Sequence, residues 1–375
     1  MRQQPEFSVI VPTVNRSEVL RHVLRSWARQ SPPEVDFEVI VIDDGSRDGT
    51  QAVFDAHRNN RYTLRTRWQS NQGPAAARNL ALGMARGRYV LFSGDDIEPS
   101  KNLLRRHLER QRDIDDERVA VLGKIEWAPA ISLTSTMKHV DGVGAQQFSY
   151  RFMKDGDEYD FRHFYTSNVS VSRDLLDNEP SGFSTDFSLA AFEDAEFAFR
   201  LRRHGLRILY ESSAVAFHHH PYDAKSFFRR QVACGQMGAV LMRKWPKTAS
   251  IIGGDEVKRS AWKARSQYGK TRRAIRRIES ELDVNEKLAI QIASAFDDRT
   301  SDGLDQYLSG LFGYAYKKGM TGAVLSPQKA LRVTAYWFLN LVGSGAVAFR
   351  ETLDGEDLEK VEPEISNLLA NLGLQ

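Results

Sequence analysis

The stretch Arg88-Tyr-Val-Leu-Phe-Ser-Gly-Asp-Asp-Ile97 decides the fold of this chain. Its apolar run 89–92 is bounded by turn-forming residues, which predicts a short buried strand. The chain can turn at Ser93-Gly94 and then presents Asp95 and Asp96. Adjacent carboxylates are hard oxygen ligands that suit Mg²⁺ or Mn²⁺, and open α/β sheets bind their ligands at this end of the strands. A solvated acidic turn is the alternative that these residues leave open.

Two earlier segments are also predicted to be strands with candidate ligand-binding residues at their ends. The first, Phe7–Pro12, is rich in β-branched residues, and the second, Phe37–Ile42, leads into Asp43 and Asp44. Segments with helical spacing separate the strands, and this alternation predicts a Rossmann-like, mostly parallel sheet with helices on both faces. We therefore expect Pro12 and both carboxylate pairs along one edge of the sheet.

This edge lacks the glycine-rich loops that bind phosphate in other nucleotide folds. The sequence contains neither G-x-G-x-x-G nor G-x-x-x-x-G-K-[ST]. A diphosphate bound here would have to be held by a metal ion and by Arg78 instead.

Four segments resemble, in order, the motifs of family 2 glycosyltransferases, which have a nucleotide-diphospho-sugar-binding fold of the GT-A type. They are Val9–Thr13, Val41–Ser46, the segment 71–79 with Asn71-Gln-Gly and Ala77-Arg-Asn79, and Gly87–Asp96. The resemblance covers roughly residues 7–220, and the ordered set is more specific than any one motif.

The resemblance implies roles for seven residues of the nucleotide-sugar site. Pro12 and Thr13 would line the nucleotide pocket, and Asp44, with Asp43 as its less certain partner, would meet the base. Arg78 would lie near the diphosphate, and Asp95, with Asp96 secondary, would bind the metal as part of a D-x-D motif. Ser93 stands where the commoner motif has an Asp, which puts the expected ribose contact in question.

A second informative stretch, Phe192–Gly205, predicts a helix that begins with Glu193 and Asp194 and ends at a glycine. Acidic residues at a helix start are favoured electrostatically, so a purely structural role is open. The resemblance implies instead that Asp194 is the base that deprotonates the acceptor hydroxyl, with inversion at the anomeric carbon. Glu193 and Asn168, the latter on a predicted strand near 166–173, would lie on the acceptor side. For Asn168, an ordinary polar strand position is equally open.

Three histidines follow the next predicted strand. In an extended chain His218 and His220 share one face, and His219 points to the other. Imidazole is a good ligand for Mn²⁺-type ions, and the resemblance implies that His218 binds the metal, with His220 as the alternative. A surface cluster of histidines is the competing interpretation. We expect Mn²⁺ or Mg²⁺ as cofactor.

After residue 224 the sheet pattern stops, so we expect a GT-A catalytic domain over 1–224 and a mainly helical domain over 225–375. The stretch 126–165 predicts loops over an acceptor site. Val333–Phe349 is apolar but short and broken by glycines, which indicates a buried or interfacial helix. The helical domain could also mediate homo-oligomer formation.

The segment 256–283 is the most basic part of the chain: it contains Lys258, Arg259, Lys263, Arg265, Lys270, Arg272, Arg273, Arg276 and Arg277. A solvated helix face competes here with a surface for an anionic membrane or a polyanionic acceptor. Stacking aromatic residues are few, so no nucleic-acid partner is expected.

The composition is that of a globular protein, with a net charge of +3 and a single cysteine, Cys234. One cysteine excludes an internal disulfide and fits a reducing compartment. The N-terminal residues lack an apolar signal-peptide core. We therefore expect a cytoplasmic protein, with a peripheral position on the inner face of the membrane as an open alternative.

Together these patterns predict a metal-dependent inverting glycosyltransferase. It would transfer a sugar from a nucleotide-diphospho-sugar, with a UDP-sugar favoured, to a hydroxyl of a glycan, glycolipid or protein-linked acceptor. The first alternative is a nucleotidyltransferase acting on a sugar phosphate, for which the sequence lacks a basic, glycine-rich triphosphate loop. The second is a non-catalytic nucleotide-sugar-binding module, against which the intact Asp44, Asp95, Asp194 and His218 argue.

Overall fold

The computed structural model describes residues 4–30, 35–57, 61–144, 146–298 and 300–372, without the side chains of 261, 265 and 267–274. The chain forms two compact units. The first contains 1–132 and 149–220, and the second contains 133–148 and 221–375. The packing thus divides close to the expected residue 224, but the second unit also includes an earlier segment of the chain.

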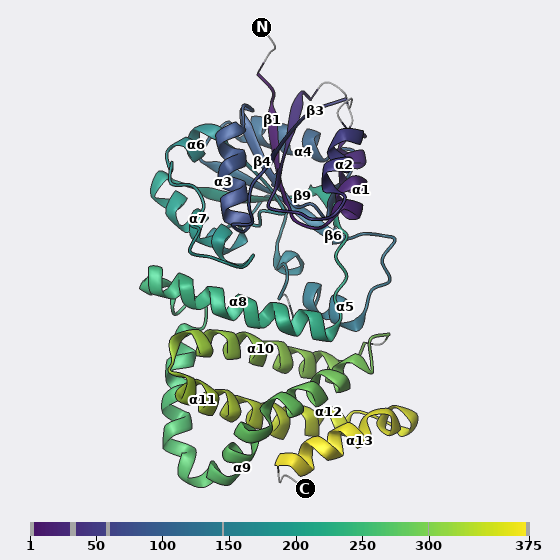
Figure 1. The fold of residues 1–375 in the computed structure, drawn as a ribbon, viewed down its shortest axis with the longest axis vertical. Helices are drawn as coiled ribbons and strands as arrows, with labels where there is room; N and C mark the ends of the chain where they lie inside the picture. Colours follow the sequence, from purple (N-terminus) through teal and green to yellow (C-terminus); the bar gives the residue numbers. More distant parts are fainter. Residues whose placement is uncertain (1–3, 31–34, 58–60, 145, 299, 373–375) are drawn as a thin grey trace. The chain divides into compact units, whose positions relative to one another are not determined.

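A mixed β-sheet forms the centre of the first unit (Figure 1). The strands follow the order β3-β2-β1-β4-β8-β6-β9-β5, with β7 paired to β9. Their bounds are β1 Phe7–Thr13, β2 Phe37–Asp43, β3 Thr63–Trp68, β4 Tyr89–Ser93, β5 Ile97–Pro99, β6 Val119–Trp127, β7 Glu158–Tyr159, β8 Asn168–Ser172 and β9 Arg207–His218.

The pairing directions align the ends of six strands. Strands β1, β2, β3 and β4 are parallel to one another, β8 is antiparallel to β4 and to β6, and β9 is parallel to β6. The carboxyl ends of β1, β2, β3, β4, β6 and β9 therefore all point to one edge of the sheet. Since β2 and β4 flank β1, the strand order also reverses at this point, where such sheets bind their ligands.

The helices of the first unit are α1 Ser17–Trp27, α2 Thr50–Ala56, α3 Pro74–Met84, α4 Leu103–Ile114, α6 Arg173–Asp177 and α7 Glu193–Leu201. In Figure 1, α3, α6 and α7 lie on one side of the sheet, and α1 and α2 lie on the other. Strands β2 and β4 are buried along their whole length, as expected for parallel strands covered on both faces. The predicted α/β architecture is confirmed.

The prediction of loops over 126–165 is wrong in part. This stretch contains the helix α5 Ser135–Asp141 together with β7 and two 3-10 turns. The hydroxyl of Thr134 caps α5 by accepting a hydrogen bond from the backbone N–H of Met137 at 3.1 Å. Because Met137 and Val140 are fully buried, α5 packs as a core element of the second unit. The Thr134 cap was the available sequence signal.

The second unit is helical. Besides α5 it contains α8 Ala224–Lys244, α9 Gly254–Ser294, α10 Asp302–Val324, α11 Pro327–Asn340, α12 Val347–Glu351 and α13 Gly355–Leu372. The predicted apolar helix at 333–349 runs through α11, a π-helical turn at Leu341–Ala346 and α12. Its residues Val333, Phe338 and Phe349 are at most 3% exposed, so the segment is a core helix.

Glycines allow two helices of this unit to approach closely. A Cβ atom added to Gly319 of α10 would lie 1.9 Å from the carbonyl oxygen of Val232 in α8. Reciprocally, a Cβ added to Gly235 of α8 would lie 1.9 Å from the carbonyl oxygen of Tyr316. Neither contact leaves room for a methyl group.

We therefore expect Gly319→Ala to lower the free energy of unfolding of this unit by about 1–3 kcal/mol, because the added methyl group overpacks the helix contact. Gly322→Ala is the matched control, since nothing lies within 4 Å of its added Cβ, and it should be neutral or stabilising by up to ~1 kcal/mol. Denaturant midpoints measure both. Equal midpoints for the two variants would contradict the close contact.

Candidate active site

The carboxylates that follow β4 lie at the common strand edge. Asp95 is 8% exposed, and its Oδ2 accepts a hydrogen bond of 2.7 Å from the hydroxyl of Thr13, the last residue of β1. Burial and the neighbouring charge of Asp96 raise the pKa of Asp95. Burial also opposes ionisation of Asp96, but hydrogen bonding and charge from His218, together with the charge of Arg16, outweigh it and hold the Asp96 pKa below its usual range. Asp95 and Asp96 are therefore both ionised only when a cation lies beside them.

Arg16 supplies such a cation, and sequence reasoning missed it. Its Nη1 forms an ion pair with Asp96 and lies 3.5 Å from Oδ1 of Asp95. Its Nη2 lies 3.1 Å from Nδ1 of His220. A positive charge therefore stands among two carboxylates and an imidazole, which are the donor types that Mn²⁺ or Mg²⁺ would use. The chemistry of this donor set suits a divalent cation, but its ligand atoms are not gathered within 4.8 Å of one another as a formed three-ligand site would require. A basic residue three positions after the Val9–Thr13 motif was the sequence signal.

The histidines after β9 divide between two faces, as predicted. Nε2 of His218 lies 3.6 Å and Nδ1 of His220 lies 3.7 Å from Oδ2 of Asp96, and the two rings stack at 5.9 Å. His218 also stacks on Trp127, the last residue of β6, at 5.2 Å. His219 points away and contacts Glu98 instead. The structure therefore brings His218 and His220 together with the aspartate pair, while their roles stay predictions.

The carboxylates that follow β2 are engaged in the adjoining loops. Oδ1 of Asp44 accepts hydrogen bonds from the Gln69 side chain and the Gln72 backbone, and its Oδ2 accepts one from the Gly73 backbone, at 2.7 to 2.8 Å. Asp43 accepts one from the backbone of Ser46 at 2.8 Å. A carboxylate has about four lone-pair sites, so Asp44 retains about one for a base.

Ser93 stands at a buried position. It is 2% exposed, and its hydroxyl has no hydrogen-bond partner among the described residues. At the following Gly94, an added Cβ would lie 2.9 Å from Oδ1 of Asp96, so a larger residue there would require the Asp96 side chain to shift.

The candidate base stands at the start of α7. The residue before the helix, Phe192, has a φ of +65°, a conformation that costs energy for a non-glycine residue and that often marks functional sites. Burial raises the pKa of Asp194, the charge of Glu193 raises it further and that of Arg78 lowers it, with a result of about 7. A carboxylate whose pKa lies near neutral pH is suited to accept a proton.

A buried ion pair fixes this helix start. Nη1 of Arg78 in α3 lies 2.8 Å from Oε1 of Glu193, with side-chain exposures of 10% and 4%. Breaking one partner of such a buried pair typically costs about 3–5 kcal/mol. Arg78 is thus paired with Glu193, whose side chain is almost fully buried, and the expected contact of Arg78 with a diphosphate stays a prediction.

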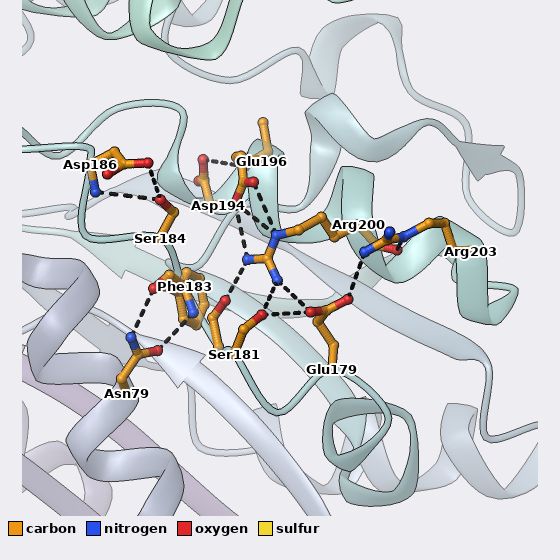
Figure 2. Close-up of polar contacts among 12 residues, drawn as sticks. Asn79, Glu179, Ser181, Phe183, Ser184, Asp186, Asp194, Glu196, Arg200 and Arg203 are labelled. Carbon is orange, nitrogen blue, oxygen red and sulfur yellow. Dashed lines mark hydrogen bonds and ion pairs between the residues drawn. The ribbon is translucent and has the colours of Figure 1, made fainter. Parts of the chain in front are cut away.

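A second network holds the body of α7, as Figure 2 shows. The guanidinium of Arg200 forms ion pairs with Glu196 at 3.0 Å and with Glu179 at 2.9 Å. The side chain of Asn79 in α3 exchanges two hydrogen bonds with the backbone of Phe183, at 2.7 and 2.8 Å. The chain that leads into Asp194 is therefore tied to α3 on one side and to α7 on the other.

Asn168 lies in the core. It is 1% exposed, its amide donates to the carbonyl oxygens of Lys124 and Ala214, and its oxygen lies 2.9 Å from Nε2 of His107 in α4. The structure gives its predicted acceptor contact no support. Alternation along β8 could not reveal that α4 covers this position.

The basic segment 256–283 belongs to α9 of the second unit. Lys258, Arg259 and Lys263 are exposed, as is Trp262 at 69%. The side chains of Arg265, Lys270, Arg272 and Arg273 lie outside the described residues. In the part of the chain that the structure describes, no helix combines the length and apolarity needed to span a bilayer.

The α/β sheet with acidic and imidazole groups at its switch point is the arrangement of a nucleotide-binding domain. Residues 8–177 match the model of the family described as Glycosyl transferase family 2. The predicted resemblance to family 2 glycosyltransferases is therefore confirmed over this segment, and the predicted GT-A fold is confirmed.

Curated relatives show the same family. The chain is similar to the poly(ribitol-phosphate) beta-N-acetylglucosaminyltransferase TarS of Staphylococcus aureus, with 39% identity over 27% of this chain and 18% of TarS. It is also similar to the uncharacterised glycosyltransferase YfnE of Bacillus subtilis, with 26% identity over 58% of this chain and 66% of YfnE. The chain therefore spans less than a fifth of the length of TarS.

A solved structure shows the same fold. The mannosyltransferase PcManGT from Pyrobaculum calidifontis, in complex with GDP-Man and Mn²⁺, aligns with a TM-score of 0.51 and 18% identity, covering 100% of this chain and 87% of that chain.

The position of Arg16 generates a prediction. If its guanidinium competes with a divalent cation for Asp95 and Asp96, Arg16→Gln should bind Mn²⁺ alone about tenfold more tightly than the parent, as expected when a competing ion pair worth roughly 1–1.5 kcal/mol is removed. Electron paramagnetic resonance of the unbound Mn²⁺ measures this affinity. Arg21→Gln, which alters an exposed ion pair with Glu18 on the same helix, is the control. Unchanged or weaker Mn²⁺ binding by Arg16→Gln would refute the competition.

Proposed function

We propose that this protein is a metal-dependent inverting glycosyltransferase that transfers a sugar from a nucleotide-diphospho-sugar to a hydroxyl acceptor, with Asp194 as general base. The observation that carries the proposal is the poised carboxylate of Asp194, whose pKa is raised to about 7. It stands on α7, which follows the segment 8–177 that matches the family 2 model, and the Asp95-Asp96 pair lies at the carboxyl edge of the sheet in the same unit.

Different side chains of the protein would carry out different parts of the reaction. Asp194 accepts the proton of the acceptor hydroxyl as its oxygen attacks the anomeric carbon from the side opposite the nucleoside diphosphate, which inverts the configuration. Asp95, with Asp96 and either His218 or His220, would hold Mn²⁺ or Mg²⁺. Such an ion neutralises the charge of the departing diphosphate. Arg16, released from the carboxylates, would be positioned to contact the diphosphate, the role first expected of Arg78.

The donor site uses the loops that follow β1 and β2. Pro12, Thr13, Asp43 and Asp44 would border the nucleoside, with Asp44 offering its remaining acceptor site to the N–H of a base. The ring N–H of uracil fits this acceptor, as that of guanine also does, so the preference for a UDP-sugar donor rests on the family resemblance. The name of TarS specifies an N-acetylglucosamine donor group and a poly(ribitol-phosphate) acceptor, so a hydroxyl-bearing glycan or lipid-linked polymer is the acceptor class we propose.

The base assignment is tested by Asp194→Asn. The amide cannot accept the proton, so transfer should fall by about 10²–10⁴-fold while nucleotide-sugar binding changes little. Turnover of a panel of nucleotide-sugars with and without Mn²⁺ measures the first quantity, and calorimetry measures the second. Asp186→Asn, an exposed carboxyl in the preceding loop, should match the parent. Equal losses of transfer and donor binding in Asp194→Asn would make Asp194 a structural residue.

We also propose a peripheral membrane contact through α9 of the second unit. Lys258, Arg259, Trp262 and Lys263 are spaced to share one helix face, and all four are exposed. Exposed tryptophan beside basic residues is typical of surfaces that lie on anionic bilayers. A membrane position would bring the domain to a lipid-linked acceptor.

Replacement of Lys258, Arg259 and Lys263 by Gln should weaken binding to vesicles containing phosphatidylserine by roughly 100-fold, because each basic residue contributes about 1 kcal/mol near such a surface. Sedimentation with vesicles measures the binding, and vesicles of phosphatidylcholine alone are the control. Parent protein that leaves both kinds of vesicle unbound would end the membrane proposal.

A further inference from the structure

A second group of metal-binding side chains lies beside the candidate active site. Nε2 of His22 and Nε2 of His219 both lie 2.8 Å from the same oxygen, Oε2 of Glu98. All three ligand atoms fall within 4.8 Å of one another, and among the described residues this is the one such group of three. Neither the family resemblance nor the proposed mechanism uses any of these residues.

The three side chains come from three separate elements. His22 lies in the second turn of α1, Glu98 lies in β5, and His219 directly follows β9. The backbone N–H of His219 donates a hydrogen bond of 2.8 Å to the carbonyl oxygen of Asp96, and Glu98 lies two residues after Asp96, so the group lies beside the aspartate pair. His219 and His218 point to opposite sides of the strand, which separates this group from the candidate active site.

The other oxygen of Glu98 is held in place. Oε1 accepts hydrogen bonds from the hydroxyl of Ser26 at 2.9 Å and from Arg29 at 3.1 Å. Such outer contacts orient a ligating carboxylate and are typical of built metal sites. They leave Oε2 directed at the two imidazoles.

We propose that His22, Glu98 and His219 bind a divalent transition-metal ion, Zn²⁺ in the first instance. Two imidazole nitrogens and one carboxylate oxygen form a common zinc donor set, and water supplies the fourth ligand. The His22 side chain is 47% exposed, which leaves access for the ion and for that water. Zinc bonds of about 2.0–2.1 Å place tetrahedral ligands roughly 3.3 Å apart, which is close to the 2.8 Å that separates each imidazole nitrogen from Oε2 of Glu98.

The bound ion would cross-link three segments of the fold. It would join α1, which follows the Arg16 loop, to β5, which follows Asp95-Asp96, and to the segment between His218 and His220. Each of these three segments carries a group of the candidate active site. The ion therefore fixes their relative positions without touching a substrate, and its binding does not depend on the proposed glycosyltransferase activity.

Without an ion, the same three residues would form only a hydrogen-bonded network in which both imidazoles donate to Glu98. The two cases differ in metal binding. We expect the protein, stripped with a chelator, to bind Zn²⁺ at this group, and one equivalent should still bind to Asp95→Asn, in which the candidate active site is impaired, and should raise its thermal midpoint. Calorimetry gives the stoichiometry, and substitution by Co²⁺ gives the visible absorption of a tetrahedral site.

His22→Gln is the most informative variant, because removal of the imidazole from this exposed helix position should leave the fold intact. It should weaken Zn²⁺ binding at least tenfold and abolish the Co²⁺ absorption. Glu18→Gln, an exposed change on the same helix, should match the parent. The inference is overturned if the parent binds no Zn²⁺, if His22→Gln binds it as tightly as the parent, or if Asp95→Asn removes the binding altogether.

Discussion

The common direction of the strands at one sheet edge is the constraint on which the site depends. Because β1, β2, β4, β6 and β9 all end there, residues that lie far apart in sequence meet without any dedicated binding loop. The edge collects two carboxylates and two imidazoles in a partly buried place, where like charges are costly. The positive charge of the Arg16 guanidinium offsets the negative charge of the carboxylates. A bound divalent cation would offset the same charge in its place.

A second constraint operates at the start of α7. The strained backbone at Phe192 and the buried pair of Arg78 with Glu193 hold Asp194 in a partly buried position. Burial disfavours the charged form of both Asp96 and Asp194, but their neighbours differ. Cationic neighbours keep Asp96 ionised, whereas Asp194 has an acidic neighbour and a pKa near neutral. Carboxylates whose environments separate their pKa values are suited to different tasks, here cation binding and proton transfer.

Sequence patterns predicted what depends on local order. The strand ending at Ser93, the carboxylates at its end, and the helix from Glu193 closed by a glycine at residue 205 with a φ of +86° are all present. The same patterns did not reveal what depends on contacts between distant elements. The position of Arg16 shortly after the Val9–Thr13 motif did not by itself indicate that it would meet Asp95. Alternation along β8 did not indicate that α4 would cover Asn168 and bury it. Residue roles that rest on motif resemblance alone therefore have to be compared with the contacts in the structure.

The most direct test of the account is the pH dependence of kcat/KM for sugar transfer under saturating Mn²⁺, compared between the parent and Glu193→Gln. Protonation of Asp194 should reduce the rate as the pH falls below about 7 in the parent. Since the charge of Glu193 raises the Asp194 pKa, its removal should move this acid limb to lower pH. Glu179→Gln, which alters only the Arg200 network, should leave the limb in place. An acid limb that is absent from the parent, or that Glu193→Gln does not move, would contradict the assignment of Asp194 as the base.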